Sequence, residues 1–176
     1  MSLFEFRIEW DDTQFQASGA RLQQTFERAS PLMADLAEGL LHSTQDRFVT
    51  STAPDGRPWA PLAPSTRLSK RGPKILVEDG YLSGLLRPSW TDNTAGVETA
   101  PLPYAQVQQD GGRKTYEIKP RAKTALSWPG GRHPTAKVIP PPLPARPYMG
   151  LSKSDQAFIV ERVHWWLGRA FGGRGA

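Results

Sequence analysis

The chain has 176 residues, no cysteine and a formal net charge of +5, from 22 basic and 17 acidic residues. The missing thiols exclude a disulfide framework, thiolate catalysis and thiolate metal sites. No apolar run approaches the ~20 residues of a membrane span, and the acidic start MSLFEFRIEWDD lacks the basic region of a signal peptide. We therefore expect one domain, residues 1–176, of a soluble protein that assembles in a cytoplasm and has no membrane partner.

The N-terminal part of the chain predicts a strand followed by helix. Residues 3–10, LFEFRIEW, alternate between apolar and charged side chains, which is typical of a half-buried antiparallel strand. Residues 18–50 carry apolar side chains at helical spacing. Within them, Ser30 followed by Pro31 resembles an N-cap with proline at the first helical position. We expect either two helices or one kinked helix, with the break near Ser30.

The middle of the chain predicts a long loop and then a hairpin. Residues 51–74 are rich in proline and lack apolar periodicity, so we expect an irregular loop held in the core by Trp59 and Leu62. A short helical or turn segment is expected within residues 75–86. The stretches LRPSWTDN and TAGVETA then predict a β-hairpin with Asp92 near its turn.

Beyond the hairpin the chain alternates between short elements and extended segments. PYAQVQQDGG predicts a short helix that ends at Gly111. Residues 116–119 and 124–128 predict further strands, and residues 129–147 are expected to be extended. The fold class we predict is α+β, with an antiparallel sheet packed against the N-terminal helical segment and a C-terminal helix, joined by long loops.

A proline-rich segment precedes the last helix. Five of the eight residues from Pro140 to Pro147 are proline, which fits neither a helix interior nor a central strand. We expect residues 139–149 to form a stiff intramolecular strap, with Arg146 and Tyr148 as its specific contacts. The alternative is a binding motif, because the pattern P-x-x-P-x-R ending at Arg146 is shared by ligands of SH3 domains.

The last helix shows the clearest signals in the chain. Ser152 and Asp155 have capping-box spacing, with aspartate in place of the usual glutamate. Apolar side chains follow at helical spacing until Gly172, where the helix is expected to stop.

Catalytic and cofactor motifs are missing from the sequence. His42, His133 and His164 have no second ligand at metal-binding spacing, so each is expected on the surface or in a loop. There is also no nucleophile elbow, phosphate loop or dinucleotide fingerprint. We therefore predict no catalytic, cofactor-binding or metal-binding residue, and no enzyme.

One basic cluster in the long loop has two interpretations. Its members are Arg67, Lys70, Arg71 and Lys74. The cluster is either a solvated loop or a contact for a phosphate backbone or an acidic partner. A second basic run lies within residues 113–123. Because no base-reading fold is evident, any DNA contact is expected to be independent of sequence.

Several short motifs occur in an order that carries a family resemblance. They are STQDRFV, PDGRPWAPLAPSTRLSK, KILVEDGYLSG, YAQVQQDGG and LPARPYMGLS. Together they resemble the phage virion morphogenesis or tail-completion family of Mu-like phages, over nearly the whole chain. The chain departs from the pattern at Gly84, Gln108 and Asp110, where the family more often has serine, histidine and an aromatic residue.

The resemblance implies a structural α+β subunit in the head–tail neck of a tailed phage, assembled in the bacterial cytoplasm. It implies a fold similar to tail-terminator and tail-completion proteins and a ring around the DNA channel, usually sixfold. Implied partners are other copies, connector or stopper proteins, the tail tube and genomic DNA. The loop 51–74 and the strap are then candidates for subunit contacts, through Trp59, Leu62, Pro144, Arg146, Pro147 and Tyr148. The alternatives are a non-specific DNA-binding protein and an adaptor that presents the proline motif.

Overall fold

The computed structural model describes residues 13–112, 117–120, 124–127, 135–139 and 142–170. Its elements are α1 (Thr13–Glu27), α2 (Ser30–Thr50), α3 (Pro64–Ser69), α4 (Tyr81–Gly84), β1 (Leu86–Trp90), β2 (Ala95–Thr99), α5 (Ala105–Asp110) and α6 (Lys153–Ala170). The α+β class is confirmed, with a two-stranded antiparallel sheet among these residues. The strand predicted at residues 3–10 lies outside the described residues.

The predicted break in the N-terminal helical segment is present, but its capping is different. Helix α1 ends at Glu27 and α2 begins at Ser30. The N-cap prediction for Ser30 is wrong, because Ser30 is the first helical residue and Ala29 holds the cap position without a side-chain hydrogen bond. Ala29 has helical dihedral angles (φ −78°, ψ −7°), so the backbone turns without needing a hydroxyl cap. Pro31 has no N–H to continue the α1 ladder, which explains the break.

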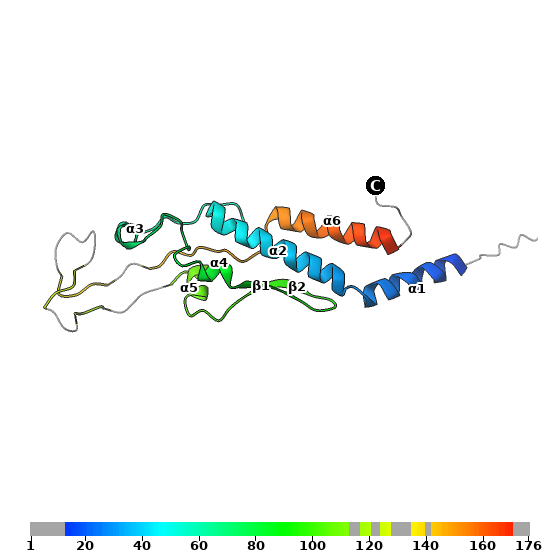
Figure 1. Ribbon diagram of the computed structural model, residues 1–176, viewed down its shortest axis with the longest axis horizontal. Coiled ribbons are helices and arrows are strands. Elements are labelled where there is room, and N and C mark those ends of the chain that lie inside the picture. Colours follow the sequence, from blue (N-terminus) through cyan, green and yellow to red (C-terminus); the bar gives the residue numbers. More distant parts are fainter. Residues whose placement is uncertain (1–12, 113–116, 121–123, 128–134, 140–141, 171–176) are drawn as a thin grey trace, which may run out of the picture.

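Helix α2 lies between the hairpin and α6 (Figure 1). On one side, Phe48 and Leu41 pack in a core cluster with Leu86 of β1, which is fully buried. The predicted hairpin is confirmed, and the backbone N–H of Thr91 donates to Thr94 O at 2.9 Å across its turn.

On its other side, α2 approaches α6 closely at Gly39. A Cβ atom added at Gly39 would lie 2.4 Å from ring atoms of Phe158. Nearby, Arg162 of α6 forms an ion pair with Asp35 of α2 at 3.2 Å. The small residue therefore sets how near the two helices lie.

The long loop is less irregular than predicted. Residues Pro64–Ser69 form the short helix α3, with proline in its first turn, where a missing N–H costs nothing. The hydroxyl of Ser69 donates to Ser65 O at 3.1 Å and closes the turn.

A narrow ribbon extends from the core beyond α5 (Figure 1). Isolated antiparallel bridges pair Gly112 with Leu143, Ile118 with Val138, and Leu126 with Thr135. The strands predicted at 116–119 and 124–128 are thus reduced, in their described residues, to single bridges. Pro120 has no N–H and cannot continue the ladder after Ile118, which gives a physical reason.

We predict that Gly39→Val destabilises the protein by about 1–3 kcal/mol, because the added side chain overpacks the contact with Phe158. Thermal unfolding of the variant measures the effect. Gly19→Ala is the control, since a Cβ there meets nothing within 4 Å and alanine favours helix. Equal melting temperatures for wild type and Gly39→Val would contradict the close approach.

Candidate functional site

The strap predicted at residues 139–149 joins the ribbon to α6 and continues in the structure to residue 152; residues 139 and 142–152 of it are described. It begins beside the end of α5, where Gly112 and Leu143 exchange two backbone hydrogen bonds and Arg146 N donates to Gln108 O at 2.8 Å. Gly111 has φ +80°, and a Cβ there would lie 2.9 Å from Leu143 O. Glycine at this predicted helix end therefore serves both the turn and the close approach of the strap.

Arg146 ties the strap to the long loop. Its side chain is buried, and it donates through Nε to Ala60 O at 2.8 Å and through Nη2 to Pro61 O at 3.0 Å. Burial lowers the pKa of Arg146, although the guanidinium stays charged at any ordinary pH. In return, Trp59 Nε1 donates to Pro147 O at 2.7 Å. The loop and the strap thus hold each other through donors on both sides.

This burial bears on the SH3-ligand alternative. Recognition of that motif requires an exposed arginine that the partner domain can bind. Arg146 is 4% exposed and donates to carbonyl groups of its own chain. The folded strap therefore does not present the arginine of the motif.

Tyr148 and Gln109 fix the centre of the strap. The Tyr148 side chain is 1% exposed, and its ring centre lies 5.3 Å from that of Phe48. Gln109 Oε1 accepts hydrogen bonds from the backbone N–H groups of Tyr148 and Met149, and its Nε2 donates to Met149 O at 3.0 Å. Burial raises the pKa of the Tyr148 phenol. The strap is thus held by aromatic packing and by one side-chain amide.

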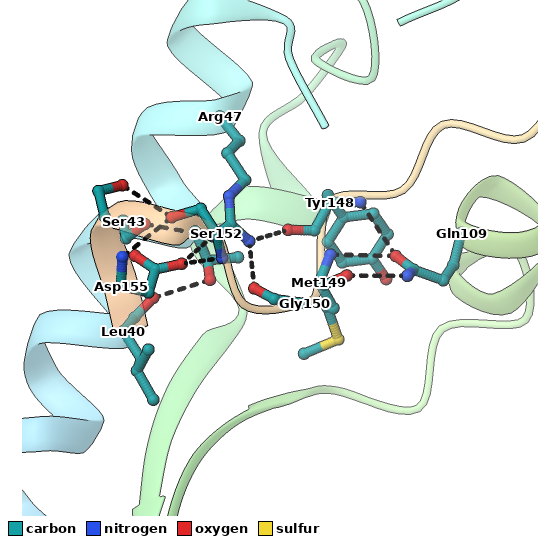
Figure 2. A network of polar contacts seen from close by, with 11 residues as sticks. Leu40, Ser43, Arg47, Gln109, Tyr148, Met149, Gly150, Ser152 and Asp155 are labelled. Atoms are coloured by element: carbon teal, nitrogen blue, oxygen red, sulfur yellow. Dashed lines mark hydrogen bonds and ion pairs between the residues drawn. The ribbon is translucent and has the colours of Figure 1, made fainter. Parts of the chain in front are cut away.

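Arg47 of α2 joins the strap to α6. Its Nη1 donates to Tyr148 O at 2.9 Å and to Gly150 O at 2.8 Å (Figure 2). Its Nη2 contacts Asp155 Oδ2 at 2.5 Å, with both side chains buried. One cation therefore satisfies two strap carbonyls and the first acidic residue of α6.

Asp155 also forms the predicted capping box. Its Oδ2 accepts from Ser152 N at 2.7 Å, and Ser152 Oγ accepts from Asp155 N at 3.1 Å. Burial by itself would raise the pKa of Asp155. Hydrogen bonds from Ser43 and Ser152 and the charge of Arg47 outweigh this effect and lower the pKa.

The predicted contact residues occupy different environments. Trp59, Arg146 and Tyr148 are buried, so their visible contacts lie within the subunit. Leu62 is half-buried and Pro144 is exposed, and both line one open groove of about 600 Å³ between the loop and the strap. Contact of these residues with a neighbouring molecule stays a prediction.

The basic cluster of the long loop is partly neutralised. Lys70 Nζ lies 2.9 Å from Glu78 and donates to the backbone as well, and hydrogen bonding to Lys70 lowers the pKa of Glu78. Arg71 lies 3.8 Å from Asp79. The remaining members, Arg67 and Lys74, are exposed.

Two central residues of the site were not singled out from the sequence, Arg47 and Gln109. A signal existed for Arg47, which continues the apolar stripe of Leu36 and Leu40 at helical spacing. A charged residue in such a stripe indicates a buried ion pair. Nothing in the local sequence distinguishes Gln109.

The described residues form neither a metal site nor a membrane-spanning helix. His42 and His164 are exposed, as predicted, whereas His133 lies outside the described residues. Among the residues that the structure describes, no group of His, Asp or Glu is placed to hold a metal ion. In the same residues, no helix combines the length and apolar character needed to cross a bilayer.

Comparison with known proteins gives one match. The model of the phage virion morphogenesis family matches residues 10–168. Neither the curated proteins nor the solved structures contain a significant match.

We predict that Asp155→Asn costs about 3–5 kcal/mol of unfolding free energy near neutral pH, because Arg47 stays buried without its counter-charge. The pKa of Asp155 is lowered in the folded state, so its contribution is present above the unfolded value of about 4 and disappears as the pH falls through the folded value. Urea unfolding at several pH values measures this difference.

The control for this prediction is Asp55→Asn. Asp55 pairs with Arg57 at 3.5 Å, but both side chains are exposed, so the expected cost is below about 1 kcal/mol. The difference in unfolding free energy between wild type and Asp155→Asn should shrink in strong acid. A difference that stays constant would contradict the link between the pKa of Asp155 and stability.

Proposed function

Since the chain belongs to the phage virion morphogenesis family, which it matches over residues 10–168, we propose that it acts at the head–tail neck. Family membership itself indicates a virion-associated protein with a role in phage morphogenesis. The finer proposal is a structural, non-catalytic subunit that forms a ring, completes the tail and helps to join it to the head. Its proposed partners are further copies of itself, connector or stopper proteins and the tail tube.

The observation that carries this proposal is the apolar surface shared by α1 and α6. Phe26 is 55% exposed and Trp165 48%. Phe26 and Trp166 bring the two helices together, with ring centres 6.1 Å apart. Large exposed apolar side chains in one region favour a protein–protein contact.

The elongated shape of the subunit supports the same proposal. The ribbon extends from one end of the core, and α1 extends from the other (Figure 1). A subunit of a ring presents different surfaces to its two neighbours. The groove lined by Leu62 and Pro144 offers a further contact surface, on the side of the long loop.

We predict that the purified protein forms a discrete ring-sized oligomer, or forms one only when isolated tails are added. Light scattering over a concentration series measures the mass. Phe26→Ser combined with Trp165→Ser should weaken this assembly, because the variant loses exposed apolar contact area.

The control is Val49→Ser, which removes an even more exposed apolar side chain, 67% exposed, from the far end of α2. This variant should assemble as the wild type does. A wild-type protein that stays monomeric even with tails would contradict the neck proposal.

A weak contact with DNA in the channel is a second proposal, for which the exposed positions of Arg67 and Lys74 are the support. We predict that Arg67→Glu with Lys74→Glu lowers the affinity of the protein for duplex DNA. The slope of log affinity against log salt concentration should also fall, by the equivalent of about two phosphate contacts. Filter binding over a salt series measures both quantities. Arg57→Glu with Arg87→Glu is the charge-matched control, and equal losses in the two variants would refute a specific role for the cluster.

A further inference from the structure

The β1–β2 hairpin has two unlike edges. Hydrogen-bonded and non-bonded pairs alternate along an antiparallel ladder. Thr91 N donates to Thr94 O next to the turn, so Pro88 and Val97, three residues further along each strand, face each other in a non-bonded pair. The backbone polar groups of both residues therefore point away from the partner strand.

Only one of these edges can accept a further strand along its whole length. At the outer edge of β1, Pro88 offers no N–H, which is a common way to protect an edge strand. At the outer edge of β2, the outward backbone groups belong to Ala95, Val97 and Thr99. Among the described residues, none of these groups takes part in a backbone hydrogen bond. The β2 edge is therefore open within the part of the chain that the structure describes.

The two faces of the hairpin specify what kind of strand fits there. One face carries Leu86 and Val97 and packs against the core. The other face is polar, and on it Ser89 Oγ donates to Glu98 at 2.7 Å. A strand added to β2 must alternate in the same way, because a shift of one residue exchanges its faces.

The segment at residues 3–10 has this alternation. Its apolar set consists of Phe4, Phe6, Ile8 and Trp10, and its charged set of Glu5, Arg7 and Glu9. Its apolar set would extend the core face of the hairpin, where Trp90 is still 45% exposed. Its charged set would lie beside the polar face.

Helix α1 runs away from the hairpin of its own subunit toward its N-terminal end (Figure 1). The 15 residues of α1 span about 22 Å, and Figure 1 shows the helix extending beyond the turn of the hairpin. If the chain before α1 folded back along the helix to reach its own hairpin, about seven of residues 1–12 would be needed to span that length at ~3.3 Å each. Too little of residues 3–10 would remain to pair along β2, so a neighbouring copy is the better acceptor.

We infer that residues 3–10 of each copy bind as a third strand to the open edge of β2 in a neighbouring copy. Backbone hydrogen bonds then provide affinity, and the alternating side chains set the register. The contact is heterologous, with a different surface on each partner, and such contacts form a ring when the rotation between neighbours closes. The inference rests on the proposed function, because it assigns the contact by which the subunits assemble.

The test is a proline placed in β2. Val97→Pro removes an outward N–H and leaves the bonds between β1 and β2 in place, as Pro88 does on the opposite strand. Val97→Ala shortens the same side chain but keeps the N–H. Light scattering, alone and with isolated tails, should show wild-type assembly for Val97→Ala and monomers for Val97→Pro. Deletion of residues 2–10 should also give monomers. A variant that combines this deletion with Val97→Pro should assemble no worse than either change alone.

Cross-linking tests the same contact in a folded protein, since the chain has no cysteine of its own. Ile8→Cys or Phe6→Cys, each combined with Val97→Cys, should give covalent multimers under an added oxidant. Glu98→Cys is the matched partner control, because it lies on the opposite face of β2 and should link poorly. Cross-links within one chain, or none in any pair, would overturn the inference.

The outcomes separate this inference from the proposed function. If the wild type assembles and Val97→Pro assembles equally well, the strand contact is wrong and the neck proposal survives. If the wild type stays monomeric even on tails, both are wrong.

Discussion

The buried guanidinium of Arg47 is the contact on which the arrangement of the subunit depends. It joins the carbonyl groups of Tyr148 and Gly150 to the carboxylate of Asp155, which lies 108 residues away in sequence. A buried ion pair adds little stability over an apolar replacement, but the loss of one partner is costly. The pair defines where the strap passes α2 and where α6 begins, and the close contact at Gly39 then sets the distance between the two helices.

The strap poses a particular hydrogen-bonding problem. Proline removes backbone donors but keeps acceptors, so a proline-rich segment that packs against the core has carbonyl groups in excess. Here the missing donors come from side chains, with Trp59 on Pro147 O and Arg47 on Tyr148 O. Arg146 does the same for Ala60 and Pro61 in the long loop, which is also rich in proline. The two irregular segments can be ordered because buried arginine and tryptophan side chains satisfy them.

Because these buried groups bind one another within the subunit, contacts with other molecules must come from the outer surfaces. The apolar side chains of α1 and α6, the groove beside Pro144 and the open edge of β2 lie in different regions of the subunit. Separate surfaces suit a protein that contacts unlike neighbours in a virion. Because stiff segments lose little entropy on binding, the strap and loop are suited to hold such surfaces in place.

The sequence by itself determined the local features, since each depends on residues close together in the chain. These include the helix break before Pro31, the hairpin, the helix end at Gly111 and the capping box of Ser152 and Asp155. The family resemblance also came from sequence, because its motifs are short and ordered. Only the tertiary structure decided that Arg47 joins three segments, that Gln109 holds the strap and that Arg146 is buried instead of exposed. Their partners lie tens of residues away, and no local pattern specifies which distant carbonyl groups a side chain will meet once the chain has folded.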